Sequence, residues 1–195
     1  MSTRLPPSAV FPCPPRKTSP LKTYAAIVEH YIKNKRPMVN ADRLVFKKRT
    51  LKEAINYAAL AKLPNGNRHP HQYRLKQDVL DQSEQRLQKL AKLLQVCETF
   101  AELHELIDQE IGGIHGMGVL TVYDIANSIG GHLGLEPEEV YLHAGTRKGA
   151  KILGFGKGQT ISRDDLPEAF QKLNPREIED CLCSYAKDLA NIKRA

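Results

Sequence analysis

Two glycines flank a single apolar residue in Gly116-Met117-Gly118, and this tripeptide is the part of the sequence that most directly suggests chemistry. Apolar residues before it fit the end of one helix, and Val122 and Ile125 continue an apolar face at helical spacing after it. Glycine tolerates positive φ and lets a phosphate approach the main chain without a Cβ in the way. The first N–H groups of the following helix lack acceptors within the helix and carry a partial positive charge. The pattern therefore predicts an anion site where the second helix begins.

In this interpretation the backbone around Gly116, Met117, Gly118, Val119 and Leu120 would hold one phosphate group. The alternative is that the two glycines only allow two core helices to turn tightly, with no ligand at all. Both interpretations stay open at the level of sequence.

The charge of the chain favours a polyanionic partner. Its formal net charge is +7, which favours nucleic acid first and an acidic protein partner second. Two stretches concentrate the positive residues: residues 33–49 hold seven lysines and arginines against Asp42, and residues 145–160 contain no carboxylate. The second stretch follows the glycine turn closely, so Arg147, Lys148 and Lys151 are expected to supply charge beside the phosphate. A solvated polar face is the alternative explanation for either stretch.

The run Ile111-Gly-Gly-Ile-His-Gly-Met-Gly-Val-Leu-Thr-Val-Tyr-Asp-Ile-Ala126 resembles the helix-hairpin-helix superfamily, and the resemblance covers residues 99–154. Members of this superfamily mostly grip the DNA backbone without reading its sequence. The resemblance implies non-sequence-specific binding of nucleic acid, with duplex DNA as the expected form, in an accessory role in DNA maintenance, mobile-element biology or defence.

The resemblance to the DNA glycosylases of that superfamily does not extend to their usual catalytic pair. Leu120 stands where lyase members carry a lysine, and Tyr141 stands where Val140-Tyr-Leu-His143 would need an aspartate. A glycosylase-like or nuclease activity would therefore depend on other residues, and Asp124 and His143 are the first candidates. Asp124 also has a simpler interpretation, because a carboxylate near a helix start complements the helix dipole. A further alternative is a helical protein-interaction or toxin-like protein whose glycines are structural.

Metal, cofactor and membrane chemistry have little support in the sequence. The four cysteines, at positions 13, 97, 181 and 183, form no Cys-x-x-Cys pair, so neither a metal nor a cofactor is expected. His69-Pro70-His71 is interpreted mainly as a polar loop, with a nucleic-acid contact or a metal ligand pair as alternatives. No apolar run approaches 18 residues, so no membrane partner is expected, and reduced cysteines fit a cytoplasmic protein.

The periodicity of the chain predicts an all-α fold, a compact multi-helix domain that contains the helix-hairpin-helix. Four segments are expected: a flexible proline-rich tail at 1–20, a basic helical part at 21–98, the helix-hairpin-helix region at 99–158, and a C-terminal helical pair at 159–195 that packs on the core.

Sequence signals also place individual helices. Capping boxes at Thr50–Glu53 and Thr99–Glu102 start two of them, and Asn174–Glu177 caps the last. A long helix is expected over 77–97. A helix over 136–145 and a short one over 146–153 would make a degenerate second hairpin at 142–153, and residues 43–48 are the only strand candidate.

Overall fold

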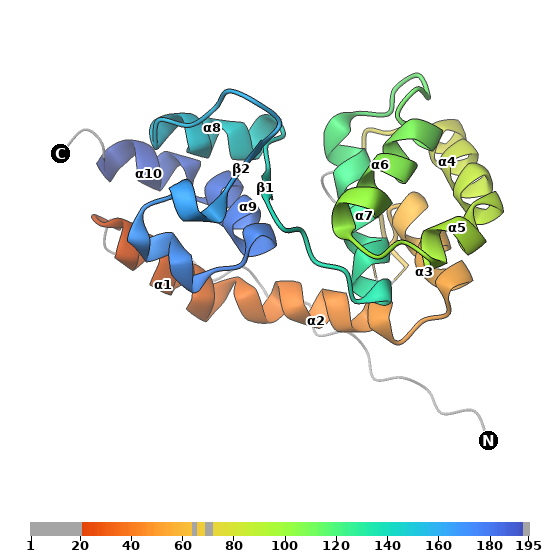
Figure 1. The fold of residues 1–195 in the computed structure, drawn as a ribbon, viewed down its shortest axis with the longest axis horizontal. Helices are drawn as coiled ribbons and strands as arrows, with labels where there is room; N and C mark the ends of the chain where they lie inside the picture. Colours follow the sequence, from red (N-terminus) through yellow and green to blue (C-terminus); the bar gives the residue numbers. More distant parts are fainter. Residues whose placement is uncertain (1–20, 64–65, 69–71, 193–195) are drawn as a thin grey trace.

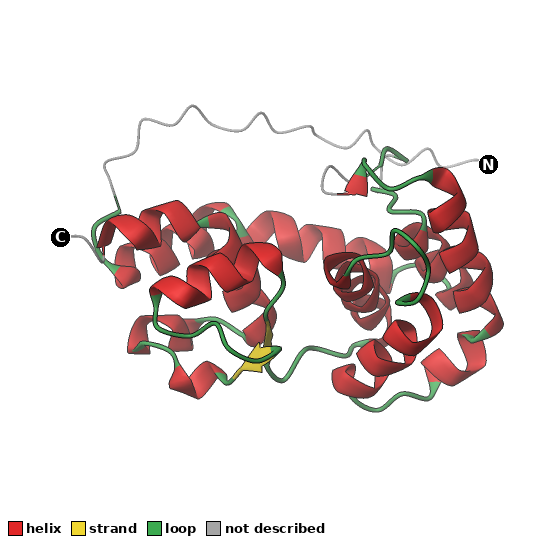
Figure 2. Cartoon of the chain, turned by 90° about the horizontal axis from the view of Figure 1, so that it is seen from above, coloured by secondary structure: helices red, strands yellow, loops and turns green. Residues whose placement is uncertain are grey.

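The computed structural model describes residues 21–63, 66–68 and 72–192, and it confirms the all-α class (Figures 1 and 2). The only named strands in this part of the chain, β1 and β2, have two residues each and pair antiparallel. The elements in chain order are α1 (Tyr24–Asn34), α2 (Arg36–Lys47), α3 (Leu51–Ala59), α4 (Gln77–Lys89), α5 (Ala91–Gln95), α6 (Phe100–Ile111), α7 (Val119–Leu133), β1 (Val140–Tyr141), α8 (Ala144–Ile152), β2 (Thr160–Ile161), the 3-10 helices η2 (Arg163–Asp165) and η3 (Glu168–Lys172), α9 (Pro175–Ser184) and α10 (Ala186–Ile192).

Three helices begin where the sequence predicts, and each has a capping box at its first turn. At the start of α3, the Glu53 backbone N–H donates to Thr50 Oγ1, and the Thr50 N–H donates to the Glu53 carboxylate at 2.8 Å. The same reciprocal pair forms at the start of α6 and at the start of α9. Each box satisfies two N–H groups that would otherwise lack a partner, so the helix starts are fixed locally.

The buried apolar side chains form two clusters. The first core brings together side chains of α3, α4, α5, α6 and α7, and the second brings together side chains of α1, β1, α8, β2, η3, α9 and α10. Figure 1 shows the two halves side by side, with α2 running along one edge of both. Residues 21–98 therefore contribute to both cores, because α1 belongs to the second core and α3 to the first.

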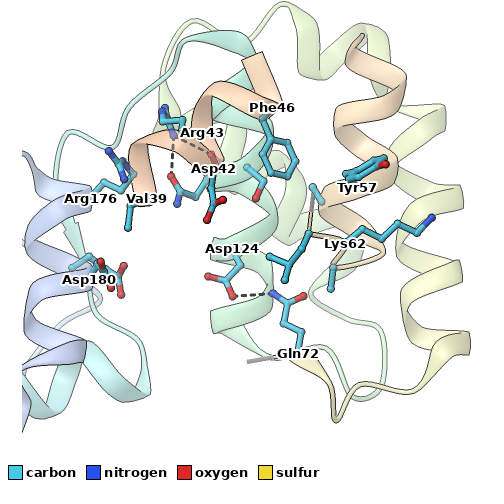
Figure 3. A pocket seen from close by; sticks show the side chains of 16 residues that line it. Val39, Asp42, Arg43, Phe46, Tyr57, Lys62, Gln72, Asp124, Arg176 and Asp180 are labelled. Carbon is cyan, nitrogen blue, oxygen red and sulfur yellow. Dashed lines mark hydrogen bonds between the residues drawn. The ribbon is translucent and has the colours of Figure 1, made fainter. Parts of the chain in front are cut away.

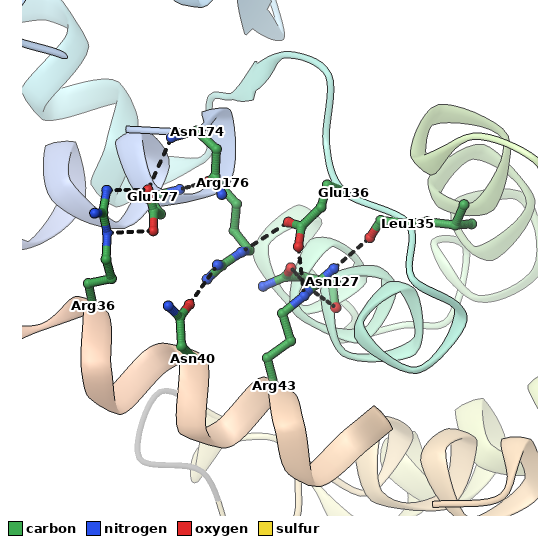
Figure 4. Close-up of polar contacts among 9 residues, drawn as sticks. All are labelled: Arg36, Asn40, Arg43, Asn127, Leu135, Glu136, Asn174, Arg176 and Glu177. Carbon is green, nitrogen blue, oxygen red and sulfur yellow. Dashed lines mark hydrogen bonds and ion pairs between the residues drawn. The ribbon is translucent and has the colours of Figure 1, made fainter. Parts of the chain in front are cut away.

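Helix α2 joins the two halves through polar contacts, and none of its side chains is buried. Arg36 pairs with Glu177 of α9 at 2.8 Å, and Arg43 pairs with Glu136 of the segment after α7 at 2.9 Å (Figure 4). The same Glu136 accepts a hydrogen bond from the buried Arg176 of α9 at 3.3 Å. One carboxylate therefore links α2 and α9 to the segment that connects the two cores.

A ring cluster also joins the halves. Tyr123 of α7 lies 5.3 Å from Tyr141 of β1 and 5.4 Å from His143, measured between ring centroids. The Tyr141 ring also meets Phe100 of α6 edge-to-face at 5.5 Å and lies tilted against His104 of α6 at 4.8 Å. Such aromatic contacts add specific geometry to the burial of apolar surface, so the start of α8 is held against α6 and α7.

Several sequence predictions of elements are wrong. Residues 43–48 belong to α2 and its C-cap, because Val39, Arg43 and Phe46 recur at helical spacing on one face of that helix. The helix expected over 77–97 is interrupted at Leu90, which caps α4 and precedes α5.

The helix expected over 136–145 does not form, and the second hairpin at 142–153 is therefore wrong as well. Val140 and Tyr141 pair with Ile161 and Thr160, because the second core buries Val140 in an extended conformation. Only α8, which starts at Ala144, matches the helical part of that prediction.

Gly149 permits the close crossing of α8 over α9. A Cβ added there would lie 2.3 Å from the Leu182 carbonyl oxygen and 3.0 Å from its Cα. We expect Gly149→Ala to lower the free energy of unfolding by about 1–3 kcal/mol, because the backbone of α9 must shift to admit the methyl group. Urea denaturation followed by circular dichroism measures this change.

The matched control for this prediction is Gly113→Ala. An added Cβ at Gly113 would meet nothing within 4 Å, so this variant should stay within about 0.5 kcal/mol of the wild type. Equal stabilities for the two alanine variants would contradict close packing at Gly149.

Candidate nucleic-acid interface

The turn between α6 and α7 is a tight glycine loop fixed by its own backbone. The Ile114 N–H donates to the Ile111 carbonyl at 3.0 Å, and the Met117 N–H donates to the Ile114 carbonyl at 2.9 Å. Gly116 has φ +96°, in the left-handed region that favours glycine. The Ile114 side chain is buried, and that of Met117 packs against the first core, so both side chains attach the loop to that core.

Helix α7 begins at this loop without a side-chain cap. Gly118 is the N-cap residue, and its carbonyl accepts from the N–H groups of Thr121 at 2.9 Å and Val122 at 3.1 Å. The N–H groups of Val119 and Leu120 precede these bonds, and no side chain in the described residues caps them. The first turn of α7 also contains no carboxylate, so the positive end of the helix dipole is not neutralised there.

The surface above this helix start is open. Gly118 and Val119 are exposed, and Val119 retains 71% of its accessible surface. A Cβ built at Gly118 would meet nothing within 4 Å, and its φ of −105° suits any residue type. An anion can therefore approach the main chain of residues 118–120 directly.

One ring contact joins the start of α8 to α7. His143, the N-cap residue of α8, contacts Tyr123 of α7, with 5.4 Å between the ring centroids. Lys148 and Lys151 are exposed on α8, and its first turn also contains no carboxylate. Of the predicted residues, Gly116, Gly118, Val119, Lys148 and Lys151 are exposed, and Met117 and Leu120 are half-buried.

Arg147, which the sequence places with these lysines, has a different environment. Its guanidinium donates to the carbonyls of Leu142, Gly156 and Gly158 at 2.7, 2.9 and 2.7 Å. These three bonds fasten the glycine-rich loop after α8 to the start of that helix. Lys148 and Lys151 are therefore better placed than Arg147 to contact an incoming phosphate.

The basic stretch 33–49 lies largely along α2, at the far end of α7. Arg43 contacts Asn127 and would touch a Cβ at Gly131, both in the C-terminal half of α7. Since α7 has 15 residues and rises roughly 1.5 Å per residue, about 20 Å separates its two ends. The Arg49 guanidinium lies 3.4 Å from the centre of the Tyr57 ring. Arg36 and Arg43 form ion pairs with Glu177 and Glu136.

The two residues suggested for catalysis are held in different ways. Asp124 lines a cavity between the halves and accepts a hydrogen bond from Gln72 Nε2 at 2.8 Å (Figure 3). His143 is buried and pairs with Glu179 at 2.5 Å, and Glu179 also accepts from the Thr146 hydroxyl at 2.6 Å. His143 is therefore a packed structural residue, whereas Asp124 faces a space that a ligand can enter.

Sequence reasoning missed this cavity, because its walls come from segments far apart in the chain. Asp42, Asp124 and Asp180 lie on three different helices, and Gln72 carries no motif. The single signal was Asp124, a carboxylate close to the glycine turn.

The described residues contain no cluster of metal ligands and no membrane-spanning helix. Within residues 21–63, 66–68 and 72–192, no three histidine, cysteine or carboxylate side chains are arranged to hold a metal ion, and Cys97, Cys181 and Cys183 are free thiols. Cys13, His69 and His71 lie outside the described residues. None of the described helices has the length and apolarity needed to cross a membrane.

Comparisons with known proteins place no relative beside this chain: no protein-family model, no curated protein and no solved structure matches it.

The contrast between Arg147 and Lys148 gives a stability prediction. Arg147→Gln should lower the free energy of unfolding by about 1–2 kcal/mol, because three carbonyls lose their charged donor. Lys148→Gln removes the same charge from an exposed position and should change stability by less than about 0.5 kcal/mol. Thermal and urea unfolding of both variants measure the difference, and equal losses would mean that the three bonds contribute nothing net.

Proposed function

We propose that this protein binds nucleic acid without sequence specificity, with duplex DNA as the expected form, through the main chain at the start of α7. The observation that carries the proposal is the exposed, uncapped helix start that follows the glycine turn. The N–H groups of Val119 and Leu120 point out of a helix whose first turn has no carboxylate, which is the arrangement that favours a bound phosphate.

The surroundings of the helix start support the same proposal. The net charge of +7 attracts a polyanion over a long range, and Lys148 and Lys151 lie exposed on α8, whose N-cap residue His143 contacts Tyr123 of α7. Contacts of main-chain N–H groups and lysines to phosphates position a protein on DNA and carry no sequence information. The proposed function is therefore an accessory one, in which the protein is held on DNA and base identity is not read.

Gly118 offers a direct test, because its backbone conformation suits any residue and nothing crowds its Cβ position. Gly118→Asp would place a carboxylate on the first N–H groups of α7, where the phosphate is proposed to bind, and it should weaken duplex affinity by at least about tenfold. Gly118→Ala adds neither charge nor a capping group, so its affinity should stay within about threefold of the wild type. Fluorescence anisotropy with a labelled random-sequence duplex over a salt series measures both.

Gly118→Asn separates charge from capping. Asparagine caps a helix about as well as aspartate, so both variants should unfold at or above the wild-type midpoint. The asparagine variant should bind DNA with intermediate affinity, because it occupies the N–H groups without repelling the phosphate. Equal duplex affinity for the aspartate and alanine variants would refute a phosphate site at this helix start.

A further inference from the structure

The cavity between the two halves is a second site, and it has an acidic wall. It has a volume of about 250 Å³ and lies where α2, α3, α7 and α9 converge (Figure 3). Four carboxylates line it: Asp42 from α2, Asp124 from α7, and Glu179 and Asp180 from α9. The cavity therefore collects negative charge from three helices in a protein whose net charge is strongly positive.

The positive side chains of the same wall are engaged elsewhere. Arg43 donates to the carbonyls of Asn127 and Leu135 and pairs with Glu136, which does not line this cavity. Arg176 also pairs with Glu136, and Lys62 donates to Asn56 at 3.2 Å. Each of these cations therefore already has a partner other than the four carboxylates of the cavity.

Gln72 provides an independent indication of a ligand. Its side chain is 95% buried, it lines the cavity, and its Nε2 donates to Asp124 at 2.8 Å. Its Oε1 has no hydrogen-bond partner in the described residues, although buried carbonyl oxygens are nearly always paired. In Figure 3 the carboxamide extends toward the ring of cavity residues beside Asp124. A buried acceptor without a partner among the described residues therefore lies in the cavity wall, next to a carboxylate.

The carboxylates of the cavity raise the pKa values of two neighbouring side chains. Burial raises the pKa of Tyr123, and the carboxylates of Glu179 and Asp124 raise it further. Burial also raises the pKa of the Cys183 thiol, and Glu179, Asp180 and Asp124 add to that shift. His143 and Thr146 hold the Glu179 carboxylate in place at the cavity wall.

The spacing of these acceptors decides what kind of cation fits. Among the described residues no three carboxylates lie close enough to coordinate one metal ion, so the negative charge is spread along the cavity wall. A cation with hydrogen-bond donors at two separated ends can reach acceptors that a single ion cannot join. The volume corresponds to roughly eight water molecules at about 30 Å³ each, which accommodates an aliphatic chain with two ammonium groups.

We infer that the cavity lined by Asp42, Gln72, Asp124 and Asp180 binds a small organic dication of the aliphatic diamine class. The ammonium groups would donate to the carboxylates and to Gln72 Oε1, and the methylene chain would lie along the apolar part of the wall near Phe46. This inference does not depend on nucleic-acid binding, because the cavity and the start of α7 use different residues.

Isothermal titration of the full chain with 1,4-diaminobutane, at constant ionic strength, tests the inference. Saturable binding with one ligand per chain is expected, and the neutral analogue 1,4-butanediol should give no saturable heat. Because a protein with a net charge of +7 repels dications in general, saturable binding reports on a local acidic site. Diamine binding no stronger than that of the diol, or no saturable heat at all, would overturn the inference and leave the cavity to water.

Variants locate the binding. Asp42→Asn and Asp124→Asn should each weaken the diamine about tenfold, because each removes a charged acceptor from the wall. Asp42 is exposed on α2, so its variant is expected to fold. The control, Glu29→Gln, removes the same charge from an exposed position on α1 and should stay within twofold. Equal losses in Glu29→Gln and Asp42→Asn would assign the binding to general surface charge and overturn the cavity site.

Discussion

Glu136 is the point at which the two halves of the molecule are fixed to each other. Its two carboxylate oxygens accept from Arg43 of α2 and from Arg176 of α9, while Arg36 pairs with Glu177 further along the same helices (Figure 4). Arg176 is almost fully buried, so removing its carboxylate partner would leave a poorly compensated charge inside the protein. This shared ion pair and the ring contact between Tyr123 and Tyr141 together hold the two cores against each other.

This placement gives α7 its central role. The start of α7 is the open, uncapped end proposed to hold a phosphate, and its C-terminal half contacts Arg43. Between them, Tyr123 packs on His143 and Asp124 faces the acidic cavity. One helix therefore connects the proposed nucleic-acid surface, the cavity and the arginine contacts. A change in how the two halves pack would alter the geometry of all three.

The parts of the fold that sequence could predict are those with local causes. The capping boxes at Thr50, Thr99 and Asn174 were predictable because donors and acceptors lie three residues apart. The turn at Gly116 was indicated by its glycine spacing, and the structure gives that residue a positive φ.

Features with non-local causes could not be predicted in this way. The strand at Val140 forms because Ile161, twenty-one residues later, pairs with it, and this overrides the helix start suggested by Pro137. Helix α2 has no buried residue, and its partners Glu136 and Glu177 are distant in the chain. The cavity escaped prediction for the same reason, since its carboxylates come from three helices. Sequence identified the proposed phosphate site because one short segment forms most of it.

The most direct measurement is a nuclear magnetic resonance titration of the ¹⁵N-labelled protein with a short random-sequence duplex. If the start of α7 binds phosphate, the amide signals of Gly118, Val119 and Leu120 should shift together and saturate at one apparent affinity, because their N–H groups would donate to the ligand. Shifts confined to the exposed lysines of α2 and its C-cap, Lys47 and Lys48, with these three amides unchanged, would contradict the account.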